Sequence, residues 1–170
     1  MTLEIFNRQR TRKINLRLLK QITNALLVEL KIEKAEFGIN LVSAKKMADL
    51  NWKFLQHEGS TDVMTFDYAK KAGPASRLPI FRSSGKLDRR DAGPVLCGEL
   101  FICVDDAIAQ AKQFGTSWQS EIVRYLVHGV LHLLGHDDRH AAARRKMKRE
   151  ENRLWRELSG KFSLAQIAGP

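Results

Sequence analysis

Four of the five histidines in the chain fall within thirteen residues: His128, His132, His136 and His140. The first two are four residues apart, so on a helix their imidazoles lie on one face about 6 Å apart and can bind one metal ion. Three residues later, Gly135 can adopt the left-handed conformation that ends a helix and turns the chain back. Such a turn delivers a third ligand to the same ion, and Asp138 stands at the expected position.

The resulting pattern, His-x3-His-x2-Gly-x2-Asp, has the spacing of the long zinc-binding motif of metzincin proteases. Those enzymes carry a glutamate general base directly after the first histidine, and this chain has Gly129 there. Peptide hydrolysis of the metzincin type would therefore lack its base. The competing interpretation is a histidine stripe used for packing or for a solvated helix face. Such a stripe requires neither Gly135 nor the acids Asp137 and Asp138.

The helix that carries the histidine pair is predicted over residues 117–134, with a capping box at Thr116 and Gln119 and a stop at Gly135. Other helices are predicted from Asn15 through Leu30, from Ser43 through Phe54, from 105 or 106 to 114, and from 141 to 158 with an end at Gly160. Strands are predicted around residues 3–7 and at 36–42, 61–68 and 95–104.

Four strands with segregated helices predict one α+β domain over residues 1–170, with helices packed on a small, mostly four-stranded mixed sheet. The metal site is expected on a helix that ends in a glycine turn. Residues 69–94 contain three of the four prolines and no hydrophobic periodicity, which predicts a long basic loop insertion, either disordered or functional.

Length and composition suit an ordinary folded protein, because 44% of the 170 residues are hydrophobic and 28% are charged. No stretch approaches the roughly 20 apolar residues of a membrane-spanning helix, and the opening residues lack the apolar core of a secretory signal. Cys97 and Cys103 would lie about 20 Å apart on one strand, too far for a disulfide. We therefore expect a cytoplasmic protein without a membrane partner.

The net charge of +10 is concentrated in three segments: residues 1–20 carry +5, residues 69–94 carry +5 and residues 139–156 carry +6. The rest of the chain therefore totals −6. A segregated basic excess favours a polyanionic partner, with nucleic acid the first candidate. The alternative is that these segments are solvated helix faces and a loop that happen to be rich in lysine and arginine.

Three segments together resemble the YbeY family of bacterial metal-dependent endoribonucleases. HGVLHLLGHDD at 128–138 is similar to the family's HGxLHLxGxDH, and LNWKFLQHEGSTDVMTF at 50–66 is similar to LNxxYRxxDxPTDVLSF. CGELFICVDDAIAQA at 97–111 resembles GDIxIxxxxAxxQA. These segments cover about half of the chain, in the family's order and with separations that fit, and the 69–94 segment reads as an unusually long insertion.

The resemblance implies a zinc-dependent, single-strand-specific endoribonuclease with one Zn²⁺ per chain. It implies a role in ribosomal RNA maturation, at the 3′ end of the small-subunit RNA, and in ribosome quality control, with RNA or the small subunit as partner. The implied catalytic and metal-binding residues are His128, His132 and Asp138. The oligomeric state does not follow from the sequence.

Two positions depart from the family pattern. The third zinc ligand of the family is a histidine, whereas this chain has Asp138, with His136 and then His140 as substitutes if the carboxylate does not reach. A carboxylate oxygen is an acceptable zinc ligand. The arginine that the family places in the second segment falls at Leu55, with Lys53 and His57 as its nearest charged or ionisable neighbours, so this chain has no guanidinium at the position that the family uses to handle RNA.

A zinc ion held by three protein ligands keeps a fourth position for water and lowers the pKa of that water, and it can also bind a phosphate oxygen. Because residue 129 is not a glutamate, three sources of the general base stay open. These are the bound water, a nearby carboxylate and an attacking RNA 2′-hydroxyl. The carboxylates that match the family segments are Asp62 and Glu99, and each has an equally good interpretation as a structural residue.

Lysine and arginine side chains supply most of the non-specific affinity for RNA. The candidate contacts are Lys70, Lys71, Arg82, Lys86, Arg89 and Arg90 in the insertion and Arg144, Arg145 and Lys148 on the last helix. For Trp52, Trp118 and Trp155, packing in the core is favoured over base stacking.

Two other functions stay open beside the endoribonuclease. One is an RNA- or ribosome-binding assembly factor of the same fold, with a structural metal and little cleavage, which Leu55 favours. The other is a metzincin-like zinc hydrolase, which the motif spacing favours and Gly129 opposes.

Overall fold

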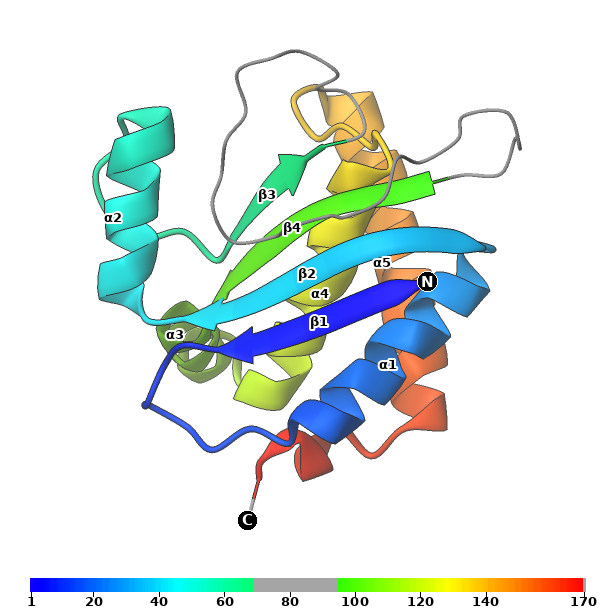
Figure 1. Cartoon of the computed structure of the whole chain (residues 1–170), viewed down its shortest axis with the longest axis horizontal. Helices are drawn as coiled ribbons and strands as arrows, with labels where there is room; N and C mark the ends of the chain where they lie inside the picture. Colours follow the sequence, from blue (N-terminus) through cyan, green and yellow to red (C-terminus); the bar gives the residue numbers. More distant parts are fainter. Residues whose placement is uncertain (69–94, 170) are drawn as a thin grey trace.

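The computed structural model describes residues 1–68 and 95–169 of the chain (Figure 1). Its strands are β1 (Thr2–Asn7), β2 (Lys34–Val42), β3 (Val63–Asp67) and β4 (Val95–Cys103). Its helices are α1 (Leu16–Glu29), α2 (Ala44–Leu55), α3 (Val104–Phe114), α4 (Trp118–Leu133), α5 (Ala141–Lys161) and the 3-10 helix η1 (Leu164–Ile167). The predicted insertion at 69–94 lies outside the described residues, and so do its candidate RNA contacts Lys70, Lys71, Arg82, Lys86, Arg89 and Arg90.

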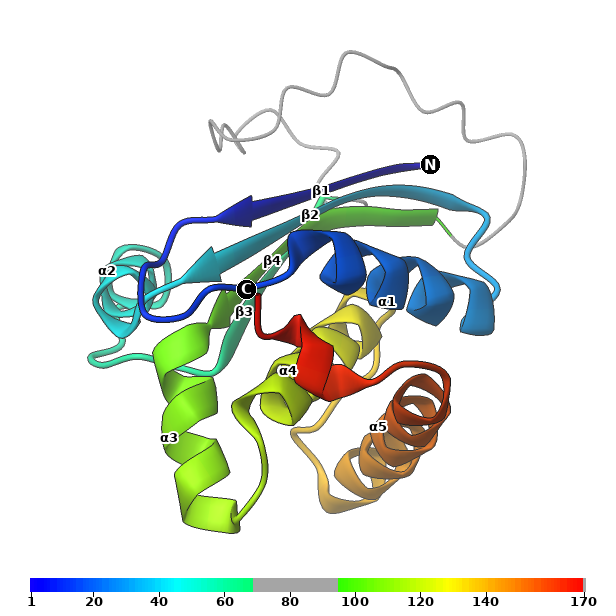
Figure 2. The same cartoon turned by 90° about the horizontal axis from the view of Figure 1, so that it is seen from below.

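The four strands form one mixed sheet in the order β1-β2-β4-β3. β2 pairs in parallel with β1 and with β4, whereas β3 pairs with β4 in the antiparallel direction. Helices α1, α3, α4 and α5 lie on one face of this sheet (Figure 2). The α+β fold class with helices on a small mixed sheet is therefore confirmed.

The main core lies between the sheet and these helices, because alternate residues of each strand point toward the helical face. On β2 these residues are Phe37, Ile39 and Leu41, all fully buried. A smaller cluster packs α2 near β3 and β4, through Val42, Met47, Leu50, Met64, Phe101 and Cys103. None of the helices in the described ranges is long and apolar enough to cross a membrane.

Most helix ends agree with the local signals in the sequence. Asn15 caps α1 by accepting a hydrogen bond from the Leu18 amide at 3.0 Å, and Ser43 caps α2. The predicted capping box at the start of α4 is wrong. Ser117 is the cap and accepts from the Ser120 amide at 3.2 Å. The predicted end at Gly160 is also wrong, because α5 continues to Lys161.

Helix α4 runs through the centre of the helical layer and carries the histidine pair. The helix packs tightly against the sheet at Gly129, where an added Cβ would clash with Leu100 and come within 3.2 Å of Val63. Leu100 is fully buried, so it has little room to move. The position after the first histidine is therefore a packing position against the sheet, and a glutamate there would require the core to rearrange.

Candidate metal centre

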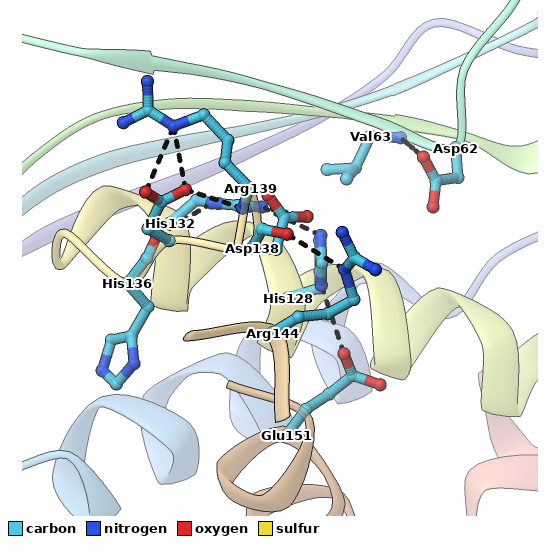
Figure 3. Close-up of polar contacts among 10 residues, drawn as sticks. Asp62, Val63, His128, His132, His136, Asp138, Arg139, Arg144 and Glu151 are labelled. Carbon is cyan, nitrogen blue, oxygen red and sulfur yellow. Dashed lines mark hydrogen bonds and ion pairs between the residues drawn. The ribbon is translucent and has the colours of Figure 1, made fainter. Parts of the chain in front are cut away.

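His128 and His132 lie in the carboxyl-terminal half of α4 (Figure 3). Their side chains are 26% and 27% exposed. Their Nε2 atoms are 3.0 Å apart, and the two rings meet edge to face with centroids 4.5 Å apart. The spacing of four residues thus places both nitrogens on the exposed side of an otherwise buried helix.

The chain turns back directly after α4 at Gly135, whose φ of +90° is in the left-handed region. The Gly135 amide donates to the His132 carbonyl at 2.9 Å, and the His136 amide donates to the Leu131 carbonyl at 3.0 Å. This pair of bonds is the Schellman arrangement that the glycine predicted. The turn brings Oδ2 of Asp138 to 3.6 Å from Nε2 of His132.

Within the described part of the chain, a cluster of side chains that could bind a metal is formed by His128, His132 and Asp138. One ligand atom from each lies within 4.8 Å of the other two. Two imidazole nitrogens and one carboxylate oxygen are a donor set that zinc accepts, with a further coordination position left open.

The Nδ1 atoms of both histidines have partners that fix the rings. Nδ1 of His132 lies 3.1 Å from the carbonyl oxygen of His136, and Nδ1 of His128 lies 3.2 Å from Oε2 of Glu151. Because a carbonyl or carboxylate oxygen accepts hydrogen bonds, each Nδ1 carries the proton and each Nε2 presents a lone pair. Two lone pairs 3.0 Å apart repel each other unless a cation lies between them, so the arrangement fits a metal ion.

Glu151 is a site residue that we did not predict from the sequence. It lies on α5 and is only 5% exposed. Burial raises the pKa of its carboxyl, but hydrogen bonds from His128 and Lys148 outweigh burial and hold the pKa below its usual value. A sequence signal did exist, because Glu151 falls in the buried stripe of α5 with Met147, Leu154 and Leu158, where an apolar residue is expected.

The other acid and histidines of the motif lie apart from this cluster. Asp137 accepts from Nε of Arg139 at 3.0 Å, and this hydrogen bond lowers the pKa of Asp137 to about 2. The ring of His136 points away from the pair, and only its backbone carbonyl takes part (Figure 3). His140 is exposed at the start of α5. Asp138 is therefore the better placed third ligand, and neither substitute is brought to the site.

A cleft of about 290 Å³ opens beside His128 and Asp138. Its other charged and polar lining residues come from α3, α4, α5 and the residue before β3: Asp62, Gln110, Glu121, Arg124, Tyr125, Arg144, Lys148 and Glu151. Asp62 uses Oδ1 to accept from the Val63 amide at 2.9 Å.

The two carboxylates considered as general bases are separated by the fold. Asp62 lines the cleft, whereas Glu99 does not. Glu99 lies on β4, is 1% exposed and accepts a hydrogen bond from the Tyr68 hydroxyl at 3.2 Å. Burial raises the pKa of Glu99, although Tyr68 and Arg8 act in the opposite direction.

The predicted RNA contacts on α5 fall into two groups. Arg144 and Lys148 line the cleft, and Nε of Arg144 donates to the Asp138 carbonyl at 3.0 Å. Arg145 is exposed but does not line the cleft. Arg124 of α4 adds a cleft cation that we did not predict. Its position four residues before His128, one turn away on the same helix face, is the signal that could have indicated it.

The expectation of core packing is wrong for Trp52, which is 61% exposed. Helix α2 packs through Met47, Leu50 and Phe54, and this stripe leaves Trp52 on the solvent side. Trp118 and Trp155 are partly buried against the main core, as expected. Leu55, at the end of α2, is 63% exposed.

The chain is similar to known proteins over most of its length. A family profile described as "Endoribonuclease YbeY" matches residues 4–159. The chain is 34% identical over 138 residues to "Endoribonuclease YbeY" of Myxococcus xanthus, covering 81% of this chain and 42% of that protein. It is 37% identical over 120 residues to the protein of the same name from Corynebacterium aurimucosum, covering 71% and 59%. For Corynebacterium glutamicum the identity is 33% over 155 residues, covering 91% and 74%.

The matched part of the chain therefore spans 42% and 59% of the length of the first two relatives. Among solved structures, the solution structure of TM1509 from Thermotoga maritima matches with a TM-score of 0.61. The alignment covers 99% of this chain and 97% of that one at 19% sequence identity. This likeness shows that the two proteins share a fold.

Proposed function

The chain belongs to the YbeY endoribonuclease family, and from that premise we propose that it is a metal-dependent endoribonuclease that hydrolyses single-stranded RNA. The observation that carries the proposal is the pair of converging Nε2 atoms with Asp138 at the edge of a cleft that is also lined by cations. Cleavage of a phosphodiester requires both a metal site and nearby cations, because the charge of the phosphate must be bound while its phosphorus is attacked.

We propose His128, His132 and Asp138 as the ligands of one zinc ion. When bound, zinc would supply a Lewis acid that neutralises charge on a phosphoryl oxygen and makes water more acidic. The side chains of Arg144 and Lys148 would contact the RNA backbone next to the ion, and Arg124 extends this basic lining along α4. Their charges would hold the phosphate in the cleft and orient the bond to be cut.

Asp62 is the carboxylate that we propose as proton acceptor. Its Oδ1 accepts from the Val63 amide, which orients the side chain and leaves Oδ2 available in the cleft. In the proposed step the attacking oxygen gives its proton to Asp62 as its bond to phosphorus forms. The bond from phosphorus to the leaving oxygen then breaks, that oxygen takes up a proton from solvent water, and Asp62 returns its proton to the solvent.

The cellular substrate that we propose is more specific than single-stranded RNA in general. The resemblance of the three sequence segments to the family supports ribosomal RNA as substrate, with maturation of the small-subunit 3′ end and ribosome quality control in the cytoplasm as the processes served. The basic segments at 1–20, 69–94 and 139–156 are consistent with a large polyanionic partner.

A second candidate function is an RNA-binding assembly factor with a structural metal and little cleavage. The exposed Leu55 favours it, because this side chain supplies no charge at the position where the resembling family has an arginine. A metzincin-like hydrolase is the weakest candidate. Gly129 packs against Leu100 and leaves no room for the glutamate general base of those enzymes.

The test combines elemental analysis of the purified protein with cleavage of single-stranded RNA. The wild type is compared with the double variant His128→Ala, His132→Ala and with a control, His136→Ala plus His140→Ala, whose rings lie outside the cluster. We expect the wild type and the control to contain zinc and to cleave, and the first variant to do neither.

The other outcomes separate the candidates. Zinc without cleavage in the wild type supports the assembly factor. A wild type without metal, purified in the absence of chelators, overturns the metal-dependent enzyme. Cleavage that survives in the first variant indicates that a different nuclease is present.

A further inference from the structure

Glu151 joins α5 to the metal centre, and the proposed function does not use it. We propose that Glu151 is a positioning residue: by accepting the Nδ1 proton of His128, its carboxylate presents Nε2 of that ring to the metal. The inference rests on the metal centre of the proposed function. The contact that carries it is the 3.2 Å hydrogen bond between Nδ1 of His128 and Oε2 of Glu151, which lie on different helices.

The place of Glu151 in α5 argues for a role beyond packing. The residue lies between Met147 and Leu154 in the stripe that faces the core, and each of these neighbours is at most 2% exposed. A carboxylate in such a stripe is costly unless hydrogen bonds compensate for its burial, so an apolar residue is the usual choice at such a position. A structural role alone would therefore not favour glutamate here.

Its contacts provide that compensation and give the carboxylate a direction. Lys148 donates to Oε1 at 2.6 Å, and Nη1 of Arg124 is 3.6 Å from the same oxygen. Arg124 is in turn held by Asn152 at 3.2 Å and lies over the ring of Trp155. With Oε1 held by cations, Oε2 stays aimed at the His128 ring.

The two histidines are oriented by different kinds of hydrogen-bond acceptor. His132 bonds to the carbonyl of His136, a backbone group inside the turn that directly follows α4. His128 depends on a side chain 23 positions later in the sequence. Only the acceptor of His128 can be removed by one side-chain substitution. Substitution of Glu151 should therefore change the tautomer of His128 and leave that of His132 unchanged.

The experiment uses Glu151→Met, because methionine suits the apolar stripe, favours a helix and removes the acceptor. Glu151→Gln keeps an acceptor oxygen without the charge. Glu150→Gln is the matched control, since Glu150 pairs with Arg153 at 2.7 Å and does not line the cleft. The measurements are the Zn²⁺ dissociation constant by competition titration, the melting temperature, and the tautomer of each histidine from ¹⁵N NMR of metal-free protein near pH 8.

We expect Glu151→Met to fold and to bind Zn²⁺ about 10–100-fold more weakly. Its His128 should show a mixture of tautomers, while His132 keeps its proton on Nδ1. Glu151→Gln should fall between this variant and the wild type, and Glu150→Gln should match the wild type.

Wild-type affinity and an unchanged His128 tautomer in Glu151→Met would overturn the positioning role. Should this variant fail to fold, the same two measurements on Glu151→Gln decide, because a purely structural role leaves affinity and tautomer unchanged in the folded protein. A wild type that binds no Zn²⁺ overturns the proposed metal centre instead. The tautomers of the metal-free protein then still test whether Glu151 orients His128.

Discussion

Nδ1 of His132 donates to the backbone carbonyl of His136 at 3.1 Å, across the turn in which Gly135 has a φ of +90°. One backbone conformation thus ends α4, orients the ring of a proposed metal ligand and starts the return of the chain toward Asp138. The metal centre should therefore be sensitive to residues that never touch the ion.

Gly135→Ala should weaken both the fold and metal binding. Space is not limiting, because an added Cβ meets no atom within 4 Å, but the left-handed backbone costs an alanine about 1 kcal/mol or more. Chemical denaturation and Zn²⁺ titration measure the two effects. Gly160→Ala is the control: Gly160 lies inside α5 with open space around it, so alanine there should stabilise by up to about 1 kcal/mol. Equal effects at the two glycines would contradict the role of the turn.

Asp138→Asn should reduce the affinity for Zn²⁺ by about tenfold or more, which corresponds to about 1.4 kcal/mol. The amide keeps the shape of the side chain but loses the anionic oxygen that lies 3.6 Å from Nε2 of His132. Asp137→Asn is the matched control, because Asp137 pairs with Arg139 and lies outside the ligand cluster. If only the Asp137 variant loses metal, the third ligand has been assigned to the wrong acid.

Arg144→Gln should lower the salt dependence of single-stranded RNA binding. Removing one phosphate contact reduces the slope of log K against log salt by about 0.7. Arg145→Gln, one residue later on the same exposed helix but outside the cleft, should leave the slope unchanged. Binding is measured by fluorescence anisotropy with RNA that cannot be cleaved. A slope that changes equally in both variants would place the RNA across the whole helix surface and not in the cleft.

The stability of the protein should depend on pH through Glu99. Burial raises the pKa of this carboxyl in the folded protein above its ordinary value of 4.5. The protonated form therefore favours folding, and its contribution is fully present below the unfolded-state pKa and is lost as pH rises through the higher folded value. Glu99→Gln cannot ionise, so it should gain stability relative to the wild type as the pH rises above the unfolded-state pKa of the glutamate. Unfolding free energies at several pH values test this, and parallel curves would contradict it.

Much of the fold and of the proposed ligand cluster could be predicted from local sequence patterns. Helical periodicity put His128 and His132 on one face of α4, and a glycine at 135 predicted the turn that returns the chain to Asp138. Asn15 and Ser43 marked helix starts correctly. These features depend on contacts within a few residues, so the residue types and their spacing are enough to predict them.

Only the tertiary structure decided which distant groups join that cluster. Glu151 reaches His128 because α5 packs beside α4, and Asp62 lines the cleft while Glu99 is buried elsewhere on the sheet. In α2, packing through Met47 and Leu50 left Trp52 in solvent. A sequence pattern indicates that a helix or strand has a buried face, but which residues meet across two elements depends on how the elements pack together.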